Sequence, residues 1–183
     1  PVLSFQIWQL GHKYSSNLLI TPQSQKRYVL GVSIKNQGNF PSLVSSLKRE
    51  TIPSYSQFSL SVPSLKIDNV EVSVDSNDLY KNLAHLPGSA LPGEKGNGFI
   101  SGHSATSWIF SKPQNIFFAR LQDLKKGDQI KVSAAGASFN YRVIEIKVVD
   151  PTDLSVIDPP NDLDRYISLM TCVPPGLNTK RLV

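Results

Sequence analysis

Short runs of alternating apolar and polar residues, separated by segments rich in proline and glycine, constrain this chain to a fold built from strands. Residues 58–62 (FSLSV) and 70–74 (VEVSV) alternate strictly, which is typical of a strand with one buried face. Thirteen prolines and eleven glycines among 183 residues leave little room for long helices. We therefore predict an all-β fold, a closed and mostly antiparallel eight-stranded barrel with a few short helices. Residues 141–149 are expected to form one long strand of it.

The beginning of the chain differs from the rest in charge. Residues 1–60 carry six of the nineteen basic residues and only one of the fourteen acidic residues, whereas the remainder is neutral. We expect residues 1–54 to form a basic N-terminal extension of unknown role and residues 55–183 to form the barrel domain. The extension either contacts an anionic surface or is an ordinary solvated arm. Within it, residues 41–50 predict a short helix.

Several function classes are disfavoured by what the sequence lacks. No stretch of eighteen apolar residues is present, so we expect no transmembrane helix within the chain. The chain opens at Pro1 without a signal-like start, and any membrane anchor is expected in a segment outside it. No basic stripe interleaved with aromatic residues and no reader motif is visible, so nucleic acid is not an expected partner.

Cys172 is the only cysteine of the chain and cannot form an internal disulfide. Such a thiol serves either as a small buried apolar side chain or in chemistry. His103 follows an expected strand over residues 98–101, and Arg181 begins the last expected strand. Together with Cys172 they make a candidate nucleophile, proton shuttle and oxyanion partner.

Five segments, taken in order, resemble the sortases of bacterial cell surfaces. The run SLMTC, ending at Cys172, is similar to the family strand T-L-x-T-C and departs from it only at Ser168. The other four are LPGSALPGE at 86–94, FISGH at 99–103, DPTDLSVI at 150–157 and KRLV at 180–183. The resemblance covers roughly residues 55–183 and leans toward the class D or E type.

The resemblance implies a sortase-type barrel and a cysteine transpeptidase. Such an enzyme cuts a sorting peptide, usually of L-P-x-T-G type, between Thr and Gly, and holds the acyl part as a thioester. It then passes the acyl group to an amine, either of the cell wall or of a surface protein. The expected location is the extracellular face of the bacterial cell membrane.

In that reaction the resemblance gives each of three residues a role. Cys172 supplies the thiolate nucleophile. His103 gives a proton to the leaving amine and takes one from the incoming amine. Arg181 meets the oxyanion or holds the substrate backbone. His85 and Lys180 are the competing histidine and cation, and we expect His85 to be chiefly structural.

The groove for the sorting peptide should be apolar. Ser101 and Met170 precede His103 and Cys172 by two residues, so strand alternation places them on the catalytic face. Thr171 could support the substrate or the oxyanion. The full set of candidate substrate-binding residues is Ala90, Leu91, Ser101, Val156, Ile157, Met170 and Thr171, each with core packing as the alternative.

We expect no metal or other cofactor. Some members of the family bind calcium through acids that precede the histidine strand and the cysteine strand. Here the first group is reduced to Glu94, and the second consists of Asp153, Asp158, Asp162 and Asp164. A hard cation takes six or more oxygen ligands, which this set does not offer from both sides.

Three alternative functions remain open from the sequence. A pilin-polymerising sortase would use a pilin lysine as the amine. Residues 1–60 lack the Asp-Pro-aromatic triplet of a pilus-type lid, which favours cell-wall anchoring slightly. A hydrolytic cysteine peptidase on the same fold would use water instead, and a non-catalytic barrel would not need Cys172 at all.

Overall fold

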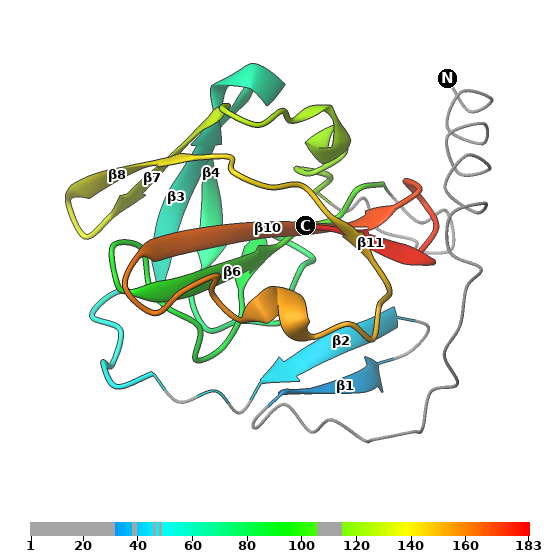
Figure 1. Cartoon of the computed structure of the whole chain (residues 1–183), viewed down its shortest axis with the longest axis horizontal. Coiled ribbons are helices and arrows are strands. Elements are labelled where there is room, and N and C mark those ends of the chain that lie inside the picture. The colour runs from blue at the N-terminus through cyan, green and yellow to red at the C-terminus, as the bar shows by residue number, and fades with distance from the viewer. Residues whose placement is uncertain (1–31, 38–39, 46, 48, 106–114) are drawn as a thin grey trace.

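Strands dominate the computed structural model of the chain, which describes residues 32–37, 40–45, 47, 49–105 and 115–183 (Figure 1). The strands are β1 (Val32–Gln37), β2 (Phe40–Ser45), β3 (Gln57–Val62), β4 (Ile67–Ser73), β5 (Leu83–His85), β6 (Gly96–Ser101), β7 (Gln129–Ala134), β8 (Ala137–Arg142), β9 (Val148–Val149), β10 (Arg165–Val173) and β11 (Lys180–Leu182). Three short 3-10 helices are η1 (Pro63–Leu65), η2 (Leu121–Asp123) and η3 (Ser155–Ile157), and the described residues contain no α-helix. The all-β prediction is confirmed.

Nine of the strands form one sheet in the order β8-β7-β3-β4-β5-β6-β10-β11-β9, and β1 pairs with β2 separately. The first and last strands of this order, β8 and β9, are joined by only residues 143–147. A sheet whose two edges are that close along the chain must curl back on itself. The sheet therefore curls into a half-barrel of nine strands, whereas the sequence predicts a closed barrel of eight.

One predicted strand is interrupted where the sheet closes. Residues 141–149 were expected to form one long strand, but β8 ends at Arg142 and β9 holds two residues. The cause is a change of partner: Val143 bonds with Gly127 and Asp128, whereas Lys147 exchanges two backbone bonds of 2.7 and 2.9 Å with Val183. Between Val143 and Lys147 the chain leaves one neighbouring segment and joins another, so the ladder of backbone hydrogen bonds is interrupted.

Two other regions differ from expectation or lie outside the described residues. The helix predicted over residues 41–50 is wrong, because residues 40–45 form β2 in register with β1. Pro41 does not prevent strand formation, since β2 pairs with a single neighbour and an edge strand tolerates proline. Residues 1–31 and 106–114 are not described, and the division at residue 54 stays a prediction.

The core explains why the alternating segments become strands. In β3 the side chains of Phe58, Leu60 and Val62 are buried while their neighbours are not, and β7 repeats the pattern through Ile130 and Val132. Burying one face of each strand removes apolar surface from water at ~25 cal/mol per Å2. That gain fixes the register, because a shift by one residue would expose the same side chains.

Most neighbouring strands are antiparallel, but the sheet is joined at its centre by parallel pairs, β4 with β5 and β6 with β10. The β6–β10 pair brings together segments about seventy residues apart in the sequence, with Ser101 opposite Met170. Both strands run side by side across the middle of Figure 1. Their carboxyl ends consequently lie at the same edge, which is where the candidate catalytic residues follow.

Candidate active site

Cys172 and Arg181 lie directly opposite each other in the sheet. They are register partners in the antiparallel pair β10–β11, flanked by Thr171 with Leu182 and Val173 with Lys180. Side chains of directly opposed residues leave the sheet on the same face. The two residues that sequence reasoning drew from different motifs are therefore brought together by the hairpin between them.

The guanidinium of Arg181 is held in place by the loop that precedes it. Its Nη1 donates hydrogen bonds to the carbonyl oxygens of Asn178 (3.1 Å) and Lys180 (3.2 Å), and the residue is only 6% exposed. The neighbouring Lys180 turns to the other side, where its Nζ lies 2.6 Å from Asp150 Oδ1 in an exposed ion pair. Strand alternation thus selects Arg181 as the cation on the cysteine face.

His103 follows the end of β6, in the position that corresponds to Cys172 on β10. Ser101 is opposite Met170, and both residues of interest lie two positions further along their parallel strands. Gly102 is bound on both sides: its N–H donates to the Met170 oxygen (3.0 Å), and its oxygen accepts the Thr171 hydroxyl (2.8 Å). These two hydrogen bonds place His103 at the edge of the sheet at which Cys172 lies.

Gly102 also needs its lack of a side chain. A Cβ at this position would lie 2.5 Å from the Leu83 Cδ2 and 2.6 Å from the Phe118 Cδ2. Both neighbours are fully buried, so they cannot move aside without opening the core. The glycine before His103 therefore lets the end of β6 approach the core closely enough to keep the register with β10.

Burial shifts the pKa values of the thiol and the imidazole in opposite directions. It raises the pKa of the Cys172 thiol, and the nearby charge of Arg181 offsets part of that rise. Burial also lowers the pKa of His103. A low-dielectric setting disfavours the charged form of each group, so burial favours the neutral thiol and the neutral imidazole.

A small cavity of about 70 Å3 opens on this face of the sheet. Four of the seven candidate substrate residues line it, together with Arg181: Ser101, Val156, Ile157 and Met170. Ser101 and Met170 come from neighbouring strands, and the other two come from η3, in the loop before β10. The cavity is thus a short cleft between a strand floor and a loop wall, leading toward the cysteine strand.

The other three candidates are placed differently. Ala90 and Leu91 do not line the cavity, and Leu91 is buried. Thr171 is buried too, and its hydroxyl is bonded to the Gly102 oxygen. In this structure Thr171 joins the cysteine strand to the histidine strand.

Sequence reasoning missed one wall of the cavity. Ala84 and Leu86, in and just after the short strand β5, line it, as does Leu154. The signal was weak, since β5 is three residues long and is followed at once by a proline–glycine run. A short apolar segment of that kind does not show strand periodicity.

A larger cavity of about 560 Å3 lies along the first half of β10, against residues 140–147. It touches neither Cys172 nor Arg181 nor His103. Size alone would favour it as a ligand site. We place the candidate site at the smaller cleft because Arg181 lines it, together with Met170 and Ser101, which precede Cys172 and His103 by two residues.

The described residues include no group of three or more His, Cys, Asp or Glu side chains able to hold a metal ion. Among the same residues, no helix has both the length and the apolar character needed to cross a membrane.

The chain matches known proteins over the region that carries these residues. A family model described as the Sortase domain matches residues 60–183. Sortase D of Bacillus subtilis (strain 168) is 33% identical over 100 residues, which are 55% of this chain and 45% of the relative. Sortase A of Listeria monocytogenes is 32% identical over 127 residues, 68% of this chain and 53% of that protein.

Solved structures give the same picture. Sortase A from Corynebacterium diphtheriae superposes with a TM-score of 0.60 at 31% identity, covering 70% of this chain and 58% of that one. Sortase C1 from Streptococcus agalactiae has a TM-score of 0.60 at 30% identity, covering 72% and 67%. The chain spans about half the length of the curated relatives it matches.

Proposed function

Because the chain belongs to the sortase family, we propose that it is the catalytic part of a cysteine transpeptidase that cleaves an LPxTG-like sorting signal. The observation that carries this proposal is the register of Cys172 with Arg181, which puts a thiol and a buried, fixed cation on one face beside a cleft. The chemistry needs both groups, a nucleophile for the peptide carbonyl and a positive charge for the oxygen that becomes negative.

In the first half-reaction, the Cys172 sulfur attacks the carbonyl carbon of the scissile bond. The carbonyl oxygen takes up the electron pair and is met by the Arg181 guanidinium. When the tetrahedral intermediate collapses, the carbon–nitrogen bond breaks, and the leaving amine takes its proton from His103. The acyl part of the peptide is then a thioester on Cys172.

In the second half-reaction, an amine attacks the thioester carbonyl and gives its proton to His103. The carbon–sulfur bond breaks and returns the sulfur to its starting state. Because burial favours the neutral pair, the attack requires that the proton of Cys172 pass to His103, before or as the substrate arrives. The amine is proposed to belong to the cell wall or to a surface protein.

The cleft lined by Ser101, Met170, Val156 and Ile157 is proposed to take the apolar residues of the sorting signal. The proposed place of action is the extracellular face of the bacterial membrane, with an anchor outside this chain. The class D or E assignment stays a prediction, since sortases A, C and D all occur among the relatives and solved neighbours.

A second candidate is the joining of pilin subunits. One solved neighbour is a pilus-related sortase C of Group B Streptococcus, 31% identical over 72% of this chain. For this chain it would mean that the accepting amine is a pilin lysine rather than a cell-wall amine. The catalytic residues would be the same in both cases.

The test is an acyl-transfer assay read by mass spectrometry. The protein is incubated with an LPxTG or LAxTG peptide and with one of three acceptors: triglycine, a lysine-containing pilin-type peptide, or water alone. We expect a ligated product with an amine and none with Cys172→Ala. Hydrolysis that no amine diverts would replace the proposal with a peptidase, and equal turnover by Cys172→Ala would end it.

A further inference from the structure

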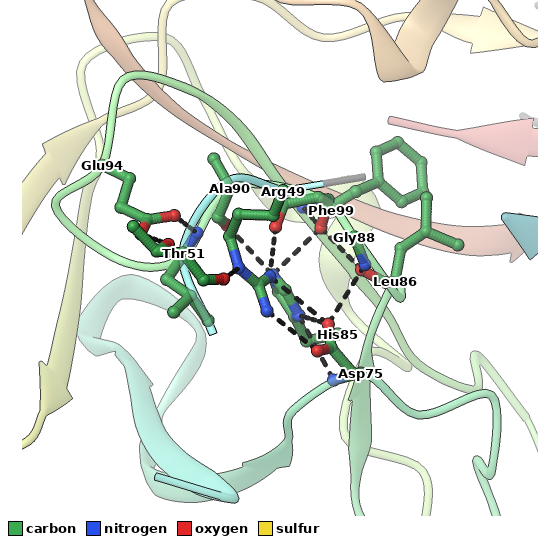
Figure 2. Close-up of polar contacts among 11 residues, drawn as sticks. Arg49, Thr51, Asp75, His85, Leu86, Gly88, Ala90, Glu94 and Phe99 are labelled. Carbon is green, nitrogen blue, oxygen red and sulfur yellow. Dashed lines mark hydrogen bonds and ion pairs between the residues drawn. The ribbon is translucent and has the colours of Figure 1, made fainter. Parts of the chain in front are cut away.

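A buried polar network lies behind the missed wall of the cleft and connects it to the N-terminal segment (Figure 2). At its centre is His85, the last residue of β5, which has no exposed surface. His85 Nε2 lies 2.9 Å from Ser89 Oγ and 3.0 Å from the Ala90 oxygen, and Nδ1 lies 3.5 Å from the Asp75 backbone nitrogen. The ring therefore joins β5 to two separate turns.

The hydrogen bonds fix the protonation of His85. The backbone N–H of Asp75 can only donate, so Nδ1 accepts and the ring hydrogen sits on Nε2. Burial lowers the pKa of His85, in agreement with a neutral ring.

Ser89, His85 and Asp75 stand in the order of a hydrolase triad, but the hydroxyl is already used. Ser89 Oγ donates to the Leu86 oxygen (2.8 Å) and accepts the Phe99 N–H (3.2 Å). Its hydrogen cannot pass to a ring whose facing nitrogen is itself protonated. The arrangement thus holds the backbone of the 86–90 turn and is not a second nucleophile.

Two charged residues complete the network. Arg49 Nη1 donates to the Ser89 oxygen (2.6 Å), Arg49 Nη2 pairs with Asp75 Oδ2 (2.8 Å), and Arg49 Nε donates to the Thr51 oxygen (3.0 Å). The Arg49 side chain is only 8% exposed. Burial raises the pKa of Asp75, but hydrogen bonds from Arg49 and from the Gly88 N–H outweigh it and leave the pKa below its ordinary range.

The turn itself has little freedom to take another shape. Gly88 has φ of +78°, and a Cβ there would lie 2.0 Å from the Leu47 oxygen. Its N–H donates to Asp75 Oδ1 at 3.1 Å. The 86–90 turn is thus in contact with Leu47 and Arg49 on one side and hydrogen-bonded to Asp75 on the other.

The turn begins with Leu86, which lines the cleft. The Leu86 side chain packs in one cluster with Phe99 and Ile157, and Met170 lies against the same cluster. The backbone of Leu86 is held by Ser89, whose N–H and hydroxyl both donate to the Leu86 carbonyl oxygen. The position of Leu86 in the wall of the cleft therefore depends on the position of the 86–90 turn.

We propose that Arg49 and Asp75 are positioning residues for the peptide-binding cleft, holding the 86–90 turn through Ser89 and His85 so that Leu86 meets the apolar part of the sorting peptide. This inference deepens the proposed function and rests on it. It gives a role to a basic residue that lies within residues 1–54, the predicted N-terminal extension.

Among the described residues, no hydrogen bond or ion pair joins the network to Cys172, His103 or Arg181. Loosening the turn should consequently weaken peptide binding and leave the chemistry alone. A network that served stability alone would instead lower the melting temperature and leave KM unchanged in the folded enzyme. The split between KM and kcat separates the two roles.

The test compares Arg49→Gln and Asp75→Asn with the wild-type chain, and uses Arg49→Lys as the conservative variant. We expect Arg49→Gln and Asp75→Asn to raise KM for the sorting peptide about tenfold, with kcat and the rate of Cys172 alkylation changed less than about twofold. Arg49→Lys should recover part of the loss, since a lysine can pair with Asp75 but has no fork for the Ser89 and Thr51 oxygens. Arg120→Gln removes an exposed ion pair with Asp123 and is the matched control.

Peptide affinity is also titrated in the Cys172→Ala background, where no turnover is needed. There we expect the dissociation constant to rise about tenfold with Arg49→Gln. An unchanged dissociation constant and KM in folded Arg49→Gln overturn the inference and leave the transpeptidase proposal intact. A wild-type chain without transfer activity overturns the transpeptidase proposal, and the titration then still decides whether Arg49 shapes the cleft. If Asp75→Asn does not fold, the two Arg49 variants carry the test.

Discussion

Replacing Arg181 with glutamine tests whether the buried cation takes part in the chemistry or merely closes a loop. Arg181 faces Cys172 across the β10–β11 pair and is almost fully buried. Within the described part of the chain, both hydrogen bonds of its guanidinium leave from Nη1. The remaining donors, on Nε and Nη2, are the ones available to a substrate oxygen.

The size of the effect follows from this geometry. A preorganised donor aimed at an oxyanion in a water-poor site is worth ~3 kcal/mol at the transition state, which corresponds to a fall in kcat of about 10²- to 10³-fold. A second effect acts on the nucleophile. Burial raises the pKa of Cys172 and the charge of Arg181 opposes that rise, so the glutamine variant should have a still higher thiol pKa.

The two effects are read separately. Transfer of an LPxTG peptide to triglycine gives kcat, and the rate of iodoacetamide alkylation across a pH series gives the titration of the thiol. Lys180→Gln is the control, because its exposed pair with Asp150 is worth at most ~1 kcal/mol and lies on the opposite face. A folded Arg181→Gln protein that keeps kcat within about tenfold of the wild type, or matches Lys180→Gln, would refute the assignment.

Three further outcomes are expected. The pH profile of kcat/KM should be a broad bell. Activity falls at low pH, below the ordinary histidine pKa of about 6.5, because His103 and Cys172 are then both protonated. Activity falls at high pH, above the ordinary cysteine pKa of about 8.5, because both have then lost their protons. A narrow bell centred on either value would contradict this, and peptide turnover from pH 4 to 11 measures it. Gly102→Ala should destabilise the fold by ~1–3 kcal/mol in urea unfolding, because its Cβ meets Leu83 and Phe118; an unchanged midpoint would show that the core gives way. Calcium should leave the transfer rate unchanged, since the described residues bring no three acidic, histidine or cysteine side chains together to hold a cation; a rate that rises with calcium and falls with a chelator would show a site.

The parts of the fold that could be predicted from the sequence are those governed by a short local period. The alternation of β3 and β7 shows in the residue pattern because each strand buries one face. The strand that ends in Cys172 and the one that begins at Arg181 were predicted with the help of the family resemblance. The break between β8 and β9 was not, because it depends on a change of partner from Gly127 and Asp128 to Val183, which no local pattern records.

The candidate site likewise has one part that the residue pattern predicts and one part that it does not. Strand alternation predicts that Ser101 and Met170 lie on the catalytic face, but it separates Arg181 from Lys180 only once the register of β11 with β10 is known. The support behind the cleft depends instead on contacts between residues far apart in the chain, such as Arg49 with Ser89 and Arg49 with Asp75. Each of those residues, taken singly, reads as an ordinary surface charge or loop residue.

This difference has a consequence for the boundary placed at residue 54. Composition separates a basic segment from a neutral body, but Arg49 and Thr51 form hydrogen bonds with Asp75 and Glu94, which lie within the body. The Arg49 side chain is 8% exposed and that of Asp75 is 33% exposed, so removing Arg49 would leave a partly buried carboxylate without its cation. Residues 49–51 therefore belong energetically with the sheet whose cleft they support, and a catalytic unit cut at residue 54 would lose the cation that Asp75 and the 86–90 turn require.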